Sequence, residues 1–312
     1  MRSFTQWFVI LFVSIFANVV MKSSSYAADP KPAKAVATAS DTVCTKAPDG
    51  VVDLRGTPGS SLCWTWDKPK DVKYVELRGC GGGAAGATGN GYGKSGSGGG
   101  GGNASPMTTM LVGPLDGEHY VIRLGRGGDP SARKADGNED LKGEATLFID
   151  ADTGVPLSSF AGATDAAPAV PSNPAAAGNT GLPSSPMYMP AKPGKSGATN
   201  THCDSLVHEG GGGGGGAGLE NGGDGGTLFG QDLRNGLPGG VCAGGGGGSG
   251  GNTDNGNSCQ VAPGKGGNGG NGALTVVPIH DLAVVENRIK SLLKTLDTGK
   301  VPEGTPAPAN TP

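Results

Sequence analysis

Apolar and polar residues follow the pattern of β-strands in several short segments of this chain. Runs of Val, Ile, Leu, Thr and Tyr are bounded by glycine or proline, which is typical of strands and the turns between them. The pattern predicts strands at Val72–Leu77, Met107–Val112, Tyr120–Leu124, Ala145–Ile149 and Ala273–Val277.

Two further apolar runs, Val51–Leu54 and Leu62–Trp66, flank the turn sequence Gly-Thr-Pro-Gly. Apolar runs on both sides of such a turn predict a β-hairpin, which we assign to an N-terminal unit of residues 41–70. Alternation along the second run places Trp64 and Trp66 on one face of the strand. We therefore expect these two rings to pack in a core rather than to stack on a sugar.

Long blocks of glycine lie between the predicted strands, an arrangement that a flexible linker gives no reason to expect. Segments without side chains can adopt the extended helix with three residues per turn, and several such helices can pack at very short distances. Hydrogen bonds between neighbouring helices then satisfy the backbone groups. The sequence predicts packed polyglycine-II helices in the blocks Gly98–Gly102, Gly210–Gly216, Gly222–Gly226, Gly244–Gly248 and Gly264–Gly272.

The glycine-rich β domain, residues 71–280, is interrupted by a segment of different composition. Residues 160–209 are rich in Ala and Pro, and Met187-Tyr188-Met189 is their one concentrated apolar feature. A stretch of this length without a strand or helix pattern is functional or disordered in most domains. We expect a long loop there.

After the last strand, apolar residues spaced 3, 4, 3 and 4 apart predict an amphipathic helix over residues 281–298, with Asp281 as its N-cap. We expect this helix to pack on its own domain, and a homotrimeric bundle is the alternative. Residues 299–312 read as a disordered tail. The apolar stripe of the helix consists of Leu282, Val285, Ile289, Leu292 and Leu296.

Composition limits what the fold can bury. The 312 residues include 62 Gly and 23 Pro, while aromatic residues are 5% and charged residues 16%, so a conventional apolar core of full size is not available. The net charge is −3 and no basic block occurs, which argues against nucleic acid as a partner.

The N-terminus has the features of a secretory signal over residues 1–27. Arg2 supplies a positive charge, Trp7–Val20 is apolar, and Ser25-Tyr26-Ala27 offers small residues before a cleavage point. Residues 28–40 are rich in Ala, Lys and Pro and read as a linker. The chain is therefore expected to be exported from a bacterial cell.

Six cysteines fit an oxidising compartment and favour disulfides. Six cysteines allow about 15 pairings, among which sequence does not choose. Proximity favours Cys44 with Cys63 and Cys242 with Cys259, each closing a loop of roughly 15 to 20 residues worth about 3 kcal/mol. Cys80 and Cys203 are the remaining two.

No catalytic constellation stands out, and we expect neither an enzyme nor a cofactor nor a metal site. His202-Cys203 and His208 lack a second closely spaced ligand pair. Asp150 and Asp152 fit a turn after a strand, and the glycines at 125–128 lack the Lys-Ser/Thr ending of a phosphate loop. Binding needs only a rigid scaffold with variable loops. The candidate contact residues in such loops are Tyr92, Phe160, Tyr188, His202 and Phe229.

The order of these elements resembles a known family. A strand and a glycine block (72–83) precede a second block and a strand–turn–strand unit that ends in Gly-x-Gly-Gly (98–128), and further blocks close with a strand (266–277). This order resembles the glycine-rich domain of bacteriophage tail-fibre adhesins and receptor-binding tips, and a similar domain occurs in anaplastic-lymphoma-kinase-type receptors. The resemblance implies a mainly β fold, in which polyglycine-II helices pack beside a β-sandwich and loops at one end contact a receptor.

A signal sequence and six cysteines depart from tail fibres and fit a bacterial protein that uses such a module outside the cell. The sequence predicts a secreted or surface-displayed adhesin, monomeric or homotrimeric, that recognises a glycan or outer-membrane protein of another cell. The alternative is a structural protein of the envelope or extracellular matrix without a specific ligand.

Overall fold

The computed structural model divides into two compact units, residues 1–42 and 43–312, and every residue described below belongs to the second. The predicted signal, the linker and the C-terminal tail lie outside the described residues. The structure describes residues 44–90, 96–132, 140–164, 166, 178–181, 192, 194–198, 200–202, 206–208, 211–216, 220–227, 234–251, 261–281, 283, 286–287 and 290.

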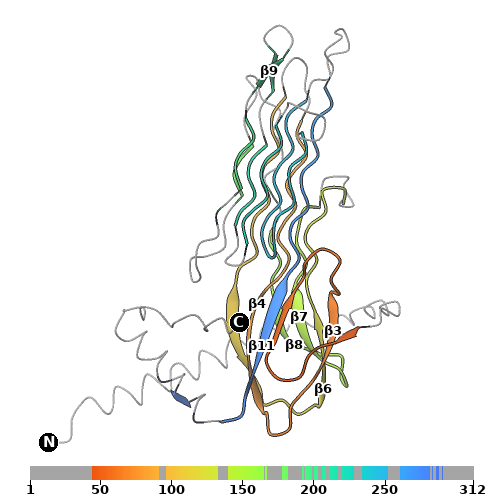
Figure 1. Cartoon of the computed structure of the whole chain (residues 1–312), viewed down its shortest axis with the longest axis vertical. Helices are drawn as coiled ribbons and strands as arrows, with labels where there is room; N and C mark the ends of the chain where they lie inside the picture. Colours follow the sequence, from red (N-terminus) through yellow and green to blue (C-terminus); the bar gives the residue numbers. More distant parts are fainter. Residues whose placement is uncertain are drawn as a thin grey trace, which may run out of the picture. The chain divides into compact units, whose positions relative to one another are not determined.

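The fold is mainly β, as predicted, and is built around two large sheets of mostly antiparallel strands (Figure 1). All five strands that the sequence predicts within the glycine-rich domain are present. The first sheet has the order β1-β3-β6-β7-β8, with β1 (Thr45–Lys46), β3 (Cys63–Asp67), β6 (His119–Arg123), β7 (Thr146–Asp150) and β8 (Pro156–Phe160). The second has the order β2-β11-β4-β5, with β2 (Val52–Arg55), β11 (Ala273–Ile279), β4 (Tyr74–Cys80) and β5 (Thr108–Val112).

The inner faces of the two sheets enclose one apolar core. Val75 and Leu77 of β4 alternate with outward residues and are fully buried. Trp66 packs with its ring centroid 5.8 Å from Tyr120 and 6.1 Å from Phe148, and those two rings stack at 5.0 Å. Trp64 is partly buried against the same core, so both tryptophans have the packing role that the sequence predicted.

The predicted N-terminal hairpin is wrong. β2 pairs with β11 and β3 pairs with β6, so the two runs belong to different sheets. The turn between them carries the chain across the sandwich, and Gly56 N donates to Gly272 O at 3.0 Å. Each of the two strands has one apolar face, and that face can be buried in the core from either of the two sheets. Residues 44–70 are thus an integral part of both sheets rather than a separate unit.

The glycine segments form extended helices with three residues per turn, as predicted. Along residues 81–90, Gly83, Gly86 and Gly89 donate to carbonyls of 261–272 at 2.8 to 2.9 Å. Residues 84, 87 and 90 donate to the segment 96–105, and residues 82 and 85 donate to 140–145. Donors three residues apart therefore meet the same neighbour, which is the repeat of this helix type.

The helix of residues 243–251 lies inside the array. Its N–H groups reach 81–90, 211–216 and 234–240, and its carbonyls accept from another three helices, 96–105, 220–227 and 261–272. Figure 1 shows the segments running side by side beyond the ends of the sheets. Hydrogen bonds in six directions leave no space between the helices, so the backbone itself is the packing surface.

Close approach, and not unusual backbone angles, explains the glycine content. Among the described glycines, positive φ occurs at Gly50, Gly59, Gly113 and Gly154, none of which is in the array. A Cβ on an array glycine would overlap a neighbouring backbone carbonyl; on Gly246 it would meet the carbonyl oxygen of Asp224.

The array extends beyond the glycine blocks that the sequence indicates. Residues 84–90 and 234–240 belong to it, and so do pieces of the predicted loop 160–209, which also contains the hairpin of β9 (Asn200–His202) and β10 (Leu206–His208). Gly194 and Gly197 donate to Gly214 and Gly211. The segment 194–198 is largely exposed, so glycine is needed only at 194 and 197, where it meets its neighbour.

The C-terminal segment begins as a helix at the predicted cap. Ala283 N donates to Asp281 Oδ1 at 2.8 Å, the geometry of an N-cap, and residues 283, 286, 287 and 290 are helical. Glu286 and Lys290 form an ion pair one turn apart, at 3.7 Å. The residues of the apolar stripe lie outside the described part, so the packing of the helix stays a prediction.

Gly246→Ala is expected to lower the free energy of unfolding by about 3 kcal/mol or more, because the methyl group would force backbone segments apart. Gly154→Ala is the matched control: its Cβ meets no atom within 4 Å, and only the strain of its φ of 69°, about 1 kcal/mol, opposes it. Urea unfolding of both variants measures the difference. Equal losses would contradict a packed array.

Candidate functional site

Several connections of the array meet at its distal end, meaning the end away from the sheets. Asn90 N donates to Ser97 O at 2.8 Å where the helices 81–90 and 96–105 are joined, and Asn90 O accepts from Gly251 N at 3.1 Å. Gly251, which precedes 252–260, is thus beside Asn90, which precedes 91–95. Figure 1 places the β9–β10 hairpin at the same end. Chain segments from distant parts of the sequence therefore share one end.

A third connection reaches this end through the helices 220–227 and 234–240. Gly226 N donates to Gly247 O, and Ser249 N donates to Arg234 O at 3.0 Å, so the residues flanking 228–233 lie beside the last turn of 243–251. The connection 182–191 is different. Its flank Lys192 accepts from Gly222 N, whose neighbour Gly223 bonds to Gly244, near the sheets.

At the edge of the array, side-chain oxygens accept the backbone hydrogen bonds that carbonyls of a neighbouring helix accept in its interior. Lys192 N donates to Asn221 Oδ1 at 3.0 Å, and Lys195 N donates to Asp224 Oδ1 at 2.7 Å, so the pattern repeats after three residues. Lys265 N donates to Asn235 Oδ1 at 2.9 Å. These side chains satisfy backbone groups that no further helix reaches. The sequence signal for these contacts is Asn or Asp at every third position between glycines, as at Asn221 and Asp224.

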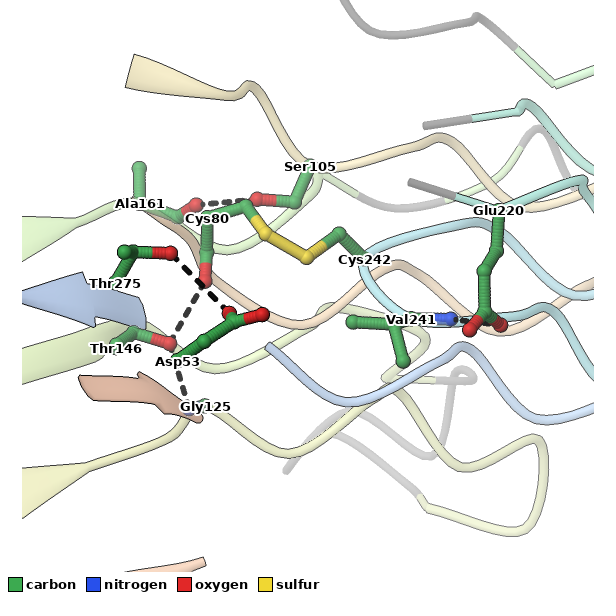
Figure 2. The surroundings of a disulfide bond; sticks show 10 residues. All are labelled: Asp53, Cys80, Ser105, Gly125, Thr146, Ala161, Glu220, Val241, Cys242 and Thr275. Carbon is green, nitrogen blue, oxygen red and sulfur yellow. Dashed lines mark hydrogen bonds between the residues drawn. A yellow bond between two sulfur atoms is a disulfide. The ribbon is translucent and has the colours of Figure 1, made fainter. Parts of the chain in front are cut away.

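Polar contacts and a disulfide fasten the array to the sheets (Figure 2). Cys80, at the end of β4, is bonded to Cys242, which precedes the helix 243–251. The buried Thr146 hydroxyl donates to Cys80 O at 2.8 Å and accepts from Gly125 N at 2.9 Å. Ser105 Oγ donates to Ala161 O at 2.8 Å. The junction therefore ties strands of both sheets to the first residues of several array helices.

One of the two disulfides predicted from proximity is confirmed and one is wrong. Cys44 is bonded to Cys63, but Cys242 is bonded to Cys80 and not to Cys259. The array brings Cys242 to the end of β4, although the two cysteines are 162 residues apart in the sequence. A prediction based on nearness in the sequence cannot find such a pair. Cys203 and Cys259 lie outside the described residues. Two disulfides fit an extracellular or secreted protein, and within the described part no helix is long and apolar enough to cross a membrane.

The predicted contact residues divide into three groups. Phe160 is wrong as a binding residue, because it ends β8 with its ring in the core and is fully buried. His202 lies in β9, where its backbone pairs with Leu206. Tyr92, Tyr188 and Phe229 lie outside the described residues; the flanks of Tyr92 and Phe229 are at the distal end, and those of Tyr188 are not.

The model of a family described as a glycine-rich domain matches residues 57–277. The chain belongs to this family. A comparison with curated proteins found no match. The matched region takes in the array, the distal connections and most of both sheets, so the candidate site lies within the glycine-rich domain.

A charged cluster lies on the five-stranded sheet of the glycine-rich domain. Asp67 accepts from Lys46 Nζ at 2.9 Å and is hydrogen-bonded to His119 Nδ1 at 2.8 Å. The bond to Asp67 raises the pKa of His119, and the bonds to Lys46 and His119 lower the pKa of Asp67. All three side chains are exposed, so the cluster stabilises the fold only weakly.

The remaining candidates for chemistry have structural roles. Asp150 Oδ1 accepts from Asp152 N at 3.0 Å and Thr153 N at 2.8 Å, which confirms the predicted turn, and these bonds, that of Thr153 above all, lower the pKa of Asp150. The glycines at 125–128 bond to 261–272 in the array. No group of three metal-binding side chains occurs among the residues described.

The Cys80→Ala/Cys242→Ala variant is expected to lose more stability than Cys44→Ala/Cys63→Ala. The chain-entropy model gives about 5 kcal/mol for a separation of 162 residues and about 3 kcal/mol for 19. Denaturant unfolding of the two double variants tests the order. A larger loss for the Cys44–Cys63 pair would mean that the junction does not constrain the unfolded chain.

Asp67→Asn is expected to lower the pKa of His119, measured from imidazole resonances by NMR. In the parent, the raised pKa means that the contribution of His119 to stability is complete below its unfolded value near 6.5 and is lost as pH rises through the folded value. Asp53→Asn, on the other sheet, is the control and should leave this titration unchanged. An unaltered His119 titration in Asp67→Asn would refute the coupling.

Proposed function

We propose that the protein is a secreted or surface-displayed bacterial adhesin, whose distal end recognises a glycan or protein on another cell. The observation that carries the proposal is the convergence of separate connections at one end of a backbone-bonded array. The residues next to 91–95, 228–233 and 252–260 meet there through direct hydrogen bonds. A binding surface is thereby assembled from segments that can vary independently.

Rigidity of the support makes this end suitable for recognition. The helices are held by backbone hydrogen bonds on several sides and by side-chain oxygens at the edge. The bonds that hold the array together among the described residues join its helices to one another. Loops on a rigid scaffold are the usual location of binding residues.

Export and the family resemblance support the same proposal. The signal-like N-terminus and the disulfides fit a protein that acts outside the cell. The order of strands and glycine blocks resembles that of tail-fibre tips, in which loops at one end of the array contact the receptor. A structural role in the producer's envelope is the second candidate, favoured by the side chains that satisfy the edge of the array and make it stable without a partner.

Binding of the purified mature protein to glycan panels and outer-membrane preparations tests the proposal. The Tyr92→Ala/Phe229→Ala variant is expected to bind at least about tenfold more weakly, a loss of about 1.4 kcal/mol. Tyr188→Ala is the matched control, because the described residues that flank 182–191 are not at the distal end, and it should bind like the parent.

Thermal unfolding checks that both variants keep the fold of the parent. Equal weakening by both variants would place recognition elsewhere. No binding by the parent, together with tight association with the producer's own envelope, would favour the structural role.

A further inference from the structure

The outer face of the four-stranded sheet carries a row of apolar side chains. Leu111 of β5 pairs with Glu76 of β4, and Glu76 pairs with Val277 of β11. Residues directly opposite each other in a sheet share a face. The next residues along these strands, Leu77 and Val276, are buried in the core, so the row of Leu111 and Val277 points outward.

The apolar character of this face is confined to the half away from the glycine array. Val51, which precedes β2, is 64% exposed and Leu111 is 46% exposed, while Tyr74 and Ile279 form a second, half-buried outward row. Glu76 is 3% exposed and ion-paired with Arg78, so its charge is neutralised.

The other half of the face has the composition of a solvated sheet. Its outward residues Thr109, Arg78, Thr275 and Asp53 are polar, and Thr275 Oγ1 donates to Asp53 Oδ1 at 3.2 Å. An antiparallel sheet that faces water alternates in this way, with polar residues outside. The apolar half departs from that rule, and an exposed group of apolar side chains marks a contact surface.

The chain itself supplies a segment of matching character at this place. β11 ends at Ile279, within the apolar half, and Asp281 caps a helix two residues later. The described residues Glu286, Asn287 and Lys290 of this helix are exposed, and they lie between the positions of the apolar stripe in the sequence. A helix over residues 281–298 is about 27 Å long, enough to cross four strands about 4.8 Å apart.

We propose that the amphipathic helix of residues 281–298 packs across the apolar half of this sheet, with its stripe on Val51, Leu111 and Val277. The helix is tethered two residues from the surface, so its effective concentration there is in the millimolar range. A second copy of the chain has no such advantage at ordinary protein concentrations. The proposal does not depend on what the distal end binds.

Photo-crosslinking of the mature protein tests the position of the helix. A benzoylphenylalanine in place of Leu111 is expected to crosslink to the peptide 281–298 within one chain, without a change in mass on a denaturing gel. The same probe at Val155, an exposed apolar residue beyond the four-stranded sheet, is the control and should not reach that peptide. Crosslinks between chains, or no crosslink to 281–298, would overturn the proposal.

Substitution in the stripe gives an independent measurement. Ile289→Glu is expected to lower the melting temperature by about 5 °C and to increase dye binding at the exposed sheet face. Asn287→Glu introduces the same charge on the exposed side and should leave both readings at the parent level. Equal melting temperatures and dye binding for the two variants would show that the stripe does not contact the sheet.

Discussion

The structure depends on hydrogen bonds between backbones that approach each other without intervening side chains. In most domains, apolar side chains separate the elements and provide the packing energy. Here the helices of the array exchange N–H···O=C bonds in up to six directions, and a single Cβ at most glycine positions would overlap a carbonyl. Glycine is costly to order, so the array depends on many such bonds being formed together.

The two sheets supply what the array lacks. They enclose the apolar core around Trp66, Tyr120 and Phe148, and they fix the starting points of the glycine helices. β4 runs directly into the helix 81–90, and the helix 261–272 runs directly into β11, which pairs with β4. The Cys80–Cys242 disulfide and the Thr146 hydroxyl fasten this boundary. Order in the sheets is thus transmitted to segments whose own apolar cluster, Ala85, Ala87, Leu141 and Ala166, is small.

The parts of the molecule that stabilise the fold are therefore different from the part that we propose binds a ligand. The core, the junction and the bonds within the array determine stability, and the described residues that flank the distal connections are themselves bonded to the array. Such connections are free to acquire contact residues, which is why the distal end supports the proposed adhesin role better than the charged surface around Asp67 does. The outer face of the four-stranded sheet differs from the distal end, because its apolar half exposes Val51 and Leu111, where we propose that the C-terminal helix packs.

Local sequence pattern was enough to predict the mainly β fold, the five strands of the glycine-rich domain, the helices with three residues per turn and the cap at Asp281. The remaining features depend on contacts between segments that are far apart in the sequence. The tertiary structure assigned β2 and β3 to different sheets, paired Cys242 with Cys80, and buried Phe160 in the core. It also drew residues 84–90 and 194–198 into the array. The segment 194–198 is largely exposed and has glycine only where it touches a neighbour, whereas 84–90 is largely buried and fits small alanine side chains between its glycines. Those outcomes depend on which segments become neighbours in space, and a local pattern carries no information about partners more than a hundred residues away.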